Sequence, residues 1–463
     1  MAMAPFSITT SSVALAPIGA ALGGRLASLQ WVVSAFALGF ATTLLPFGSL
    51  ADRRGRKRLF VAGTALFAVT SLATAAAPTM AVLLAIRAVQ GAAGAMCTAS
   101  GIAILTNEFR EPAARKAAFG VLGSIVGLGL VLGAVAGGPL VDVVGWRVGL
   151  VAHVPLALVA LRCAGPIVES RGPSGPADVP GALASAGMLG FAIAYGTIAP
   201  TQRWASAGSI ALLVGAMTSG VAFFWLETSS AAPMIDLHMF RERAFAGASL
   251  LALSFTSIWV ALFIFVPLYL QVAHERSASA AGLWLLLLLG PGAVAPLLAA
   301  RLGRRCSPHM LLVTGSLLMS AGCFAAALLE TGSLRGIAVG LVITGVGAGF
   351  VNGLMDYVAV SALPEERSGV AGGAFYAMRL VGDAIAGVVP GTILTLEVAR
   401  RLDVSRARAS AIVAGDTSEA GGGALDMLAR DTYAAAMSAL LAVLALGAFA
   451  NAALSYFAFR PKA

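Results

Sequence analysis

Long apolar runs separated by short polar segments dominate this sequence of 463 residues. A helix that crosses the hydrocarbon core of a membrane needs about 20 largely uncharged residues. Fourteen runs meet that need, so we predict an all-α polytopic membrane protein with spans at about 5–22, 29–51, 59–78, 80–106, 117–141, 146–168, 180–200, 207–226, 246–272, 280–300, 309–329, 335–362, 369–396 and 432–458. The first run is rich in hydroxyl side chains and suits a helix beside a wet cavity better than one against lipid.

Polar segments divide the predicted spans into groups. Residues 169–180 and 227–245 have the composition of linkers, and 397–431 that of an outer loop. We therefore predict a six-helix bundle at 1–168, two extra transmembrane helices with linkers at 169–245, and a second six-helix bundle at 246–463. The stretch ARLGRRCSPHMLL (300–312) follows span ten as GSLADRRGRKRLF (48–60) follows span two. Such internal similarity is expected of a transporter built from two related halves.

Composition supports the membrane assignment, since 59% of the residues are hydrophobic and only 11% charged. The net charge of +9 does not indicate nucleic-acid binding, because the basic residues form short clusters between apolar runs. Most of them fall in loops on one side of the predicted topology, which places both termini in the cytoplasm. The four cysteines occur singly, without the spacing of a disulfide framework or zinc site.

The charged loop resembles the loop signature of the major facilitator superfamily, whose characteristic positions are occupied here by Gly48, Asp52, Arg53, Gly55, Arg56 and Lys57. RAVQGAAGAM (87–96) is similar to a second motif of that family, at Arg87, Gln90 and Gly91. In the family, the aspartate and arginines of the loop latch the cytoplasmic ends of helices from the two halves. The resemblance implies that Asp52 accepts hydrogen bonds from the start of span thirteen, near Ser368 and Gly369.

Two further stretches are similar to the fourteen-helix drug:proton antiporters of that superfamily. GLVLGAVAGGP (129–139) resembles their glycine-rich antiporter motif, with Ala134 in place of the usual proline and glycines at Gly129, Gly133, Gly137 and Gly138. GWRVGLVAHVP (145–155) resembles the start of their sixth span, with His153 in place of asparagine. Glycines four residues apart share one helix face and permit close packing, so both ordinary packing and an antiporter role remain open.

The resemblance implies a proton-coupled exporter of small amphipathic or hydrophobic compounds in the bacterial inner membrane. It would work by alternating access as a monomer, with a substrate cavity between its halves, and with no cofactor or metal. The alternative is an exporter or proton symporter for a dedicated metabolite that could be anionic. Arg87 and Arg379 provide buried positive charge, while Ser7 and Ser12 replace the subgroup's acid and asparagine in span one. An enzyme is not expected, because no HExxH, GxSxG, P-loop or Cys/His cluster is present.

Ionisable residues inside spans are costly and are candidates for function. The candidates for proton coupling or substrate contact are Arg87, Gln90, His153, Asn352, Asp356, Arg379 and Asp383. Arg379 and Asp383 lie four residues apart and could neutralise each other, with Asp356 as a competitor for the arginine. The two carboxylates could couple protons, or an ion pair could simply join two helices.

Arg87 and His153 have similar alternatives. Arg87 could take part in proton coupling, or could bond carbonyls and hydroxyls of neighbouring helices, including span one. For His153, a neutral imidazole that replaces asparagine as a hydrogen-bonding group is favoured over a proton carrier.

Overall fold

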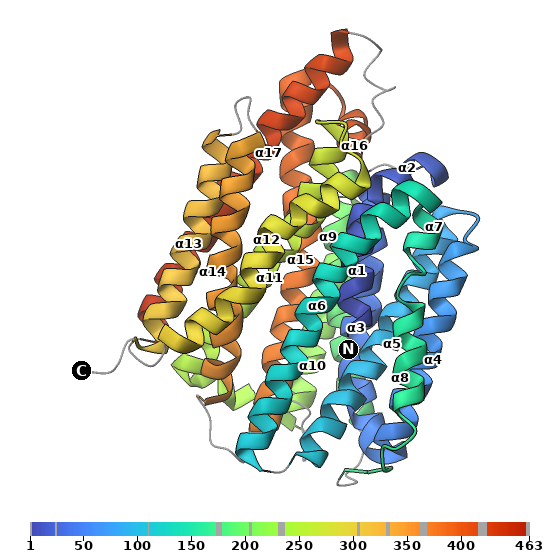
Figure 1. Cartoon of the computed structure of the whole chain (residues 1–463), viewed down its shortest axis with the longest axis vertical. Coiled ribbons are helices and arrows are strands. Elements are labelled where there is room, and N and C mark those ends of the chain that lie inside the picture. Colours follow the sequence, from blue (N-terminus) through green and yellow to red (C-terminus); the bar gives the residue numbers. More distant parts are fainter. Residues whose placement is uncertain are drawn as a thin grey trace. The chain divides into compact units, whose positions relative to one another are not determined.

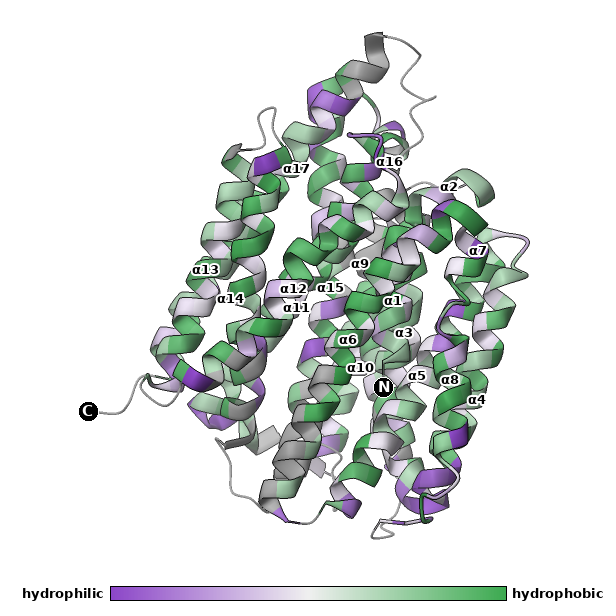
Figure 2. Ribbon diagram, viewed as in Figure 1, coloured by the Kyte–Doolittle hydropathy of each residue, from purple (hydrophilic) through white to green (hydrophobic). Residues whose placement is uncertain are grey.

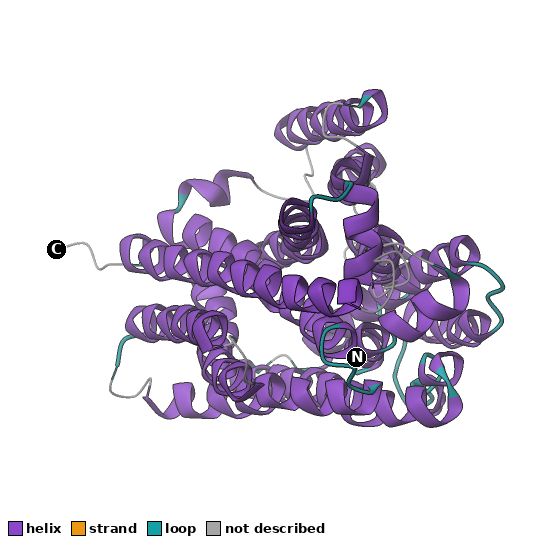
Figure 3. Cartoon of the chain, turned by 90° about the horizontal axis from the view of Figure 1, so that it is seen from above, coloured by secondary structure: helices purple, strands orange, loops and turns teal. Residues whose placement is uncertain are grey.

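Helices form the backbone of this computed structural model, which describes residues 2–23, 26–109, 111–172, 178–202, 206–229, 237–302, 306–329, 334–361, 368–414 and 424–459. Within these ranges no β-strand occurs (Figure 3). The chain divides into two compact units, one formed by Met1–Gly23 with Trp31–Met234 and the other by Gly24–Gln30 with Ile235–Ala463. Apolar residues dominate the helices, and hydrophilic residues gather mainly near their ends (Figure 2).

The first unit contains the helices α1 (Met3–Val13), α2 (Leu15–Leu22), most of α3 (Leu26–Arg54), α4 (Arg56–Ala75), α5 (Met80–Glu108), α6 (Pro112–Val144), α7 (Trp146–Gly149), α8 (Val154–Cys163), α9 (Val179–Gln202) and α10 (Ala207–Ser229) (Figure 1). In this unit α1 packs on α6, α4 packs on α5 and α8, and α9 packs on α10. The two helices predicted as an extra segment thus form a hairpin that groups with the first unit. The predicted boundaries at 168 and 245 stay predictions.

The second unit contains the 3₁₀ helix η1 (Leu237–Arg241) and the helices α11 (Arg243–Val272), α12 (Ala278–Leu302), α13 (Pro308–Leu329), α14 (Leu334–Ser361), α15 (Ser368–Leu402), α16 (Arg406–Ala414) and α17 (Ala424–Ala458). Helix α11 is its centre, since it packs on α12, α14, α15 and α17. The sequence pattern did not predict η1 or α16. Both lie in segments that we expected to be a linker and an outer loop, because they are too short to show a clear apolar periodicity.

Breaks in the helices have local causes. Helices α1 and α2 meet at 62° after a run of hydroxyl residues. In this run Ser11 and Ser12 donate to the carbonyls of Ser7 and Ile8, a bonding pattern that often bends helices. Helix α3 bends by 50° at Pro46, which lacks the N–H that would continue the helical ladder.

Each predicted span coincides with a helix or with helices joined at a break. Among the described residues, ten helical segments are long and apolar enough to cross a membrane, or twelve when each bent pair counts as one span. Helix α15 is not among them, and α9 contributes only a shorter apolar helix at Pro180–Tyr195. The chain is therefore a multi-pass protein by length and composition, and fourteen crossings stay a prediction.

Candidate functional site

The charged loop is a tight turn between α3 and α4. Gly55 has φ of 117°, a conformation that glycine adopts readily and other residues rarely do. A Cβ at Gly55 would also lie 2.7 Å from the carboxyl carbon of Glu169. Asp52 Oδ1 accepts from Arg56 Nε at 2.8 Å and lies 2.7 Å from Arg56 Nη2. The other arginine nitrogen, Nη1, donates to the carbonyl of Ala103 in α5 at 3.3 Å, so this ion pair ties the loop to α5.

Glu169 belongs to this loop site, although the sequence placed it in a linker. Its carboxylate accepts from the backbone N–H groups of Lys57 at 2.9 Å and Arg58 at 3.1 Å. A carboxylate at a helix N-terminus accepts hydrogen bonds from backbone N–H groups that have no partner within the helix. The positive end of the helix dipole also stabilises its negative charge. The backbone adds bonds from Arg56 N to Ser170 O and from Gly172 N to Asp52 O. The Lys57 ammonium also donates to the carbonyl of Gly165 at 2.7 Å.

Sequence reasoning missed Glu169 because more than a hundred residues separate it from α4. The available signal was an isolated acid opposite a basic loop on the predicted cytoplasmic side. The predicted bond from Asp52 to the start of α15, near Ser368 and Gly369, joins residues of different units and stays a prediction.

Replacement of Glu169 by alanine should loosen the first turn of α4. Loss of a capping carboxylate costs about 1 kcal/mol, which corresponds to roughly fivefold more frequent local opening. Limited trypsin digestion should therefore cut at the arginines of the loop about fivefold faster. Glu108→Ala is the matched control, since Glu108 is an exposed acid at the end of α5. Equal cleavage rates in the two variants would contradict the capping role.

Glycines bring α3 and α5 into backbone contact beside Arg87. A Cβ at Gly91 would overlap the carbonyl oxygen of Phe36, and one at Gly39 would overlap that of Ala88. This close crossing lets the Arg87 side chain on α5 reach the backbone of α3. The motif match at Gly91 therefore has a packing explanation.

Arg87 is sealed within the first unit, with 1% of its surface exposed. It donates from Nε to Val32 O at 3.0 Å and from Nη1 to Ser7 Oγ at 2.8 Å and Gln90 Oε1 at 2.6 Å. Its guanidinium also lies 4.7 Å from the centroid of the Phe36 ring. No carboxylate among the described residues pairs with it. These contacts match the interpretation of Arg87 as a group that bonds carbonyls and hydroxyls, including those of the first span.

The same network continues to His153. Gln90 Nε2 donates to Ser71 Oγ at 2.7 Å, and Ser71 Oγ lies 2.6 Å from His153 Nε2. Ser71 also donates to the carbonyl of Phe67, which leaves its oxygen to accept from the amide and the imidazole. His153 is fully buried, and its Nδ1 finds no partner in the described part of the chain. His153 thus donates from Nε2 to the Ser71 hydroxyl, a contact expected of a neutral hydrogen-bonding group.

The glycine-rich face of α6 packs on α1. A Cβ at Gly129 would lie 2.5 Å from Ala2 O, one at Gly133 would lie 2.6 Å from Phe6 O, and one at Gly137 would lie 2.7 Å from Thr10 Oγ1. Gly138 and Ala134 are also buried. Packing is thus a demonstrated role of this face, and a special role in antiport stays a prediction.

Opposite effects are expected when an acid is placed at two positions of α1. Ser7→Asp would supply a carboxylate beside a buried guanidinium that has none, and we expect the thermal midpoint to rise by about 2 °C or more. Ser12→Asp would bury a charge at a site where the serine only bonds the carbonyl of Ile8. We expect that variant to be less stable than the natural protein. A fall in the midpoint for both variants, in detergent melts, would contradict the uncompensated charge of Arg87.

In the second unit, α14 is packed on two faces by its glycines. A Cβ at Gly340 would lie 2.6 Å from the carbonyl oxygen of Gly322 in α13, and one at Gly349 would lie 2.7 Å from that of Gly292 in α12. The polar residues Asn352 and Asp356 follow Gly349 toward the C-terminal end of α14. Both are exposed within the second unit.

Arg379 on α15 links these two residues. Its Nη1 donates to Asp356 Oδ1 at 3.2 Å, and its Nη2 donates to Asn352 Oδ1 at 3.0 Å. The side chain of Arg379 is 22% exposed and that of Asp356 is 55% exposed, so the pair is open on one side. Of the two carboxylates that could compete for the arginine, Asp356 holds it.

Asp383 lies one turn beyond Arg379 and is half-buried. Its carboxylate forms no hydrogen bond and no ion pair with the residues that the structure describes. The predicted neutralisation of Arg379 by Asp383 stays a prediction. The site thus contains two carboxylates and one guanidinium, and in the described part of the chain the ion pair of the guanidinium is with Asp356.

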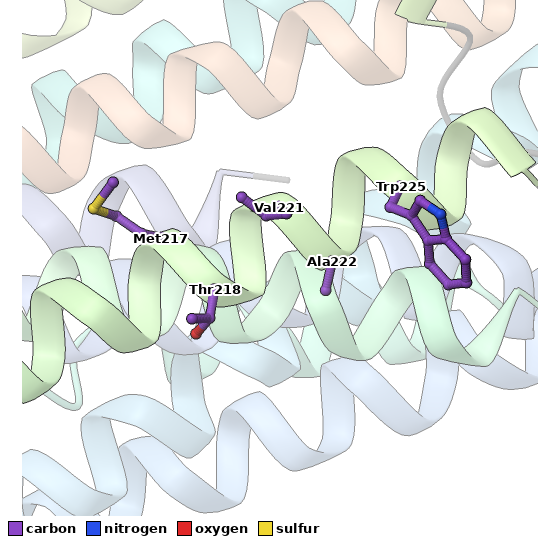
Figure 4. A pocket seen from close by; sticks show the side chains of 5 residues that line it. All are labelled: Met217, Thr218, Val221, Ala222 and Trp225. Atoms are coloured by element: carbon purple, nitrogen blue, oxygen red, sulfur yellow. The ribbon is translucent and has the colours of Figure 1, made fainter.

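A shallow groove of about 430 Å³ lies along α10 (Figure 4). Met217, Val221, Ala222 and Trp225 line it, with Thr218, whose hydroxyl bonds carbonyls of its own helix. Such a surface lacks the polar groups that orient a ligand and suits contact with lipid. No group of three His, Cys, Asp or Glu side chains among the described residues could hold a metal ion.

Comparisons with known proteins agree with this architecture. A family model described as the Major Facilitator Superfamily matches residues 1–387. The chain is 31% identical over 403 residues to the tetracenomycin C resistance and export protein of Streptomyces glaucescens, which covers 86% of this chain and 74% of that protein. It is 32% identical over 385 residues to the multidrug efflux pump LfrA of Mycolicibacterium smegmatis, which covers 81% and 75%.

Among solved structures, the fold is similar to a bacterial homolog of the human lysosomal transporter Spinster. The TM-score is 0.70 at 17% sequence identity, with 99% of this chain and 94% of that chain covered. A second similar structure is the nucleoside transporter NupG, with a TM-score of 0.60 at 12% identity, covering 99% and 100%.

Proposed function

We propose, from the premise that this chain belongs to the major facilitator superfamily, that it exports small amphipathic or hydrophobic compounds in exchange for protons. As a member of that family, the chain is a multi-pass membrane transporter and not an enzyme. Relatives at about 30% identity carry names of antibiotic resistance and export. The proposed location is the bacterial inner membrane, with fourteen crossings and both termini in the cytoplasm.

One observation carries the proton coupling: in the described part of the chain Arg379 forms an ion pair with Asp356, while Asp383 forms no hydrogen bond or ion pair. An ionised carboxylate without a partner is unfavourable in a membrane interior, so it takes up a proton or a cationic group. A transporter can use this by protonating the acid on one side of the membrane and releasing the proton on the other. The proton then biases an equilibrium between two conformations, which is what exchange requires.

The charges also bear on the alternative of a dedicated anionic substrate. That alternative used Arg87 and Arg379 as positive charge for binding. Arg87 is sealed by Val32, Ser7 and Gln90, and Arg379 is held by Asp356. Because two carboxylates face one guanidinium on α14 and α15, the local charge disfavours an anion. We therefore favour an amphipathic or hydrophobic substrate.

Purified protein in liposomes tests this proposal directly. With ethidium and puromycin as probes, an imposed pH gradient should drive each compound against its concentration gradient. A protonophore should abolish the accumulation, and removal of ATP should not change it. Accumulation that follows the membrane potential but ignores the pH gradient would contradict proton exchange. Transport of anionic probes alone would instead support the dedicated anion carrier.

A further inference from the structure

Two hydroxyl groups of α11 bond to the turn of α15 that carries the charged residues. Thr256 Oγ1 donates to the carbonyl oxygen of Arg379 at 2.9 Å, and Ser257 Oγ donates to that of Gly382 at 3.0 Å. In an α-helix the carbonyl of residue 379 also accepts from the N–H of residue 383. Thr256 therefore donates to the same carbonyl oxygen that accepts the helical hydrogen bond from the N–H of Asp383.

Each hydroxyl has a second acceptor within α11. Thr256 Oγ1 lies 2.9 Å from the carbonyl oxygen of Ala252, and Ser257 Oγ lies 2.8 Å from that of Leu253. A hydroxyl has one hydrogen to donate, so it can bond α15 or its own helix. Separation of the two helices would therefore leave no donor unsatisfied, and the contact can open and close at low cost.

Gly382 fixes the contact line between the two helices. A Cβ at this position would overlap Thr256 Oγ1 and the carbonyl oxygen of Leu253, so the backbones touch. At about 100° per residue, Arg379 and Asp383 lie roughly 60° and 100° around α15 from this line, on the same side. The orientation of α15 at Gly382 thus sets where both charged side chains point.

The first unit contains the same contact without charges. Thr10 Oγ1 donates to Gly133 O at 3.3 Å, and a Cβ at Gly133 would lie 2.6 Å from Phe6 O and 3.0 Å from Thr9 Cβ. Phe6, Thr9 and Thr10 thus correspond in spacing and contacts to Leu253, Thr256 and Ser257. The turn of α6 beside Gly133 carries Leu130 and Ala134 where α15 carries Arg379 and Asp383.

Resting on the proton exchange proposed above, we infer that Thr256 and Ser257 are positioning residues for the charged site. Their bonds hold α15 in the orientation in which Arg379 donates to Asp356 and Asn352 on α14 and not to Asp383, as far as the described residues show. When the hydroxyls return to their own helix, α15 is free to turn, and Arg379 can approach Asp383 one turn away on the same helix. The hydroxyl pair thus decides which carboxylate the arginine neutralises.

Liposome assays with ethidium separate this role from general packing. Proton-driven export depends on the charged site. Exchange of labelled for unlabelled ethidium without a pH gradient requires only that the protein binds ethidium and carries it across the membrane. Thr256→Val keeps the shape of the side chain and removes the hydroxyl. We expect it to lower the maximal rate of proton-driven export about fivefold. The KM of export and the rate of exchange of labelled for unlabelled ethidium should change less than about twofold. Thr256→Ser should retain both activities, and Ser257→Ala should show the same split as Thr256→Val.

Thr10→Val is the matched control for Ser257→Ala, since Thr10 corresponds to Ser257 and donates to a turn of α6 that carries no charge. It should change the two activities in equal proportion. An equal loss of both activities in Thr256→Val, or the same split in Thr10→Val, would overturn the positioning role. Absence of proton-driven export in the unmodified protein would instead refute the proposed function, so the two failures are distinguishable.

Discussion

Replacement of Asp383 by asparagine is expected to abolish proton-driven export. The side chain keeps its size and half-buried position but can no longer exchange a proton. Because the carboxylate has no partner among the described residues, its loss breaks no hydrogen bond, and we expect the thermal midpoint to stay within about 2 °C. Cells expressing the variant should accumulate ethidium as cells without the transporter do, a difference of at least about tenfold in efflux rate.

Asp356→Asn provides the comparison for this result. That substitution removes an ion pair with Arg379 at 3.2 Å, so it should lower stability as well as transport. Breaking such a pair leaves the guanidinium uncompensated next to Asp383, which can then take its place. We expect partial export by this variant. Unchanged efflux in Asp383→Asn, together with complete loss in Asp356→Asn, would move the proton site to Asp356.

The second large effect is expected at the crossing of α3 and α5. Gly91→Ala would place a methyl group on the carbonyl oxygen of Phe36, and backbone cannot move aside as a side chain can. The helices must separate, and the bond from Arg87 to Val32 lengthens with them. We expect a destabilisation of about 3 kcal/mol or more, from overpacking and a buried guanidinium with a weakened partner.

Gly94→Ala is the control on the same helix. A Cβ there would meet only side-chain rings, those of Phe40 at 3.3 Å, Phe67 at 3.4 Å and Phe36 at 3.5 Å, and a side chain can shift by a few tenths of an ångström. Thermal stability measured by size-exclusion chromatography of heated detergent extracts should separate the two variants by at least about 5 °C. Similar melting of both would mean that the α3–α5 contact is less tight than the backbone positions indicate.

The hydrophobic pattern determined much of this architecture by itself. Every predicted span coincides with a helix or with two helices joined at a break, because a run of about 20 apolar residues in a membrane must satisfy its backbone internally. Glycine spacing likewise indicated a packed face at Gly129, Gly133 and Gly137. The rare charges inside spans also pointed to Arg87, Asp356, Arg379 and Asp383. Such charges can be read from one sequence because their cost in hydrocarbon is a property of the residue type.

Partners between helices could not be read from the sequence. Glu169 reaches the start of α4 across more than a hundred residues, and Thr256 reaches the backbone of α15 across a similar distance. Helical periodicity tells which residues share a face but not which helix that face meets. Arg379 illustrates the limit, since Asp356 and Asp383 were both plausible partners from the sequence.

The sequence by itself thus determined the helices, the family motifs and the identity of the charged residues, since these follow from local composition and spacing. Only the tertiary structure decided that Arg87 is buried within the first unit and that Arg379 forms its described ion pair with Asp356. Those outcomes depend on backbone contacts at Gly91 and Gly382, where the absence of a side chain sets how closely two helices approach and how they turn.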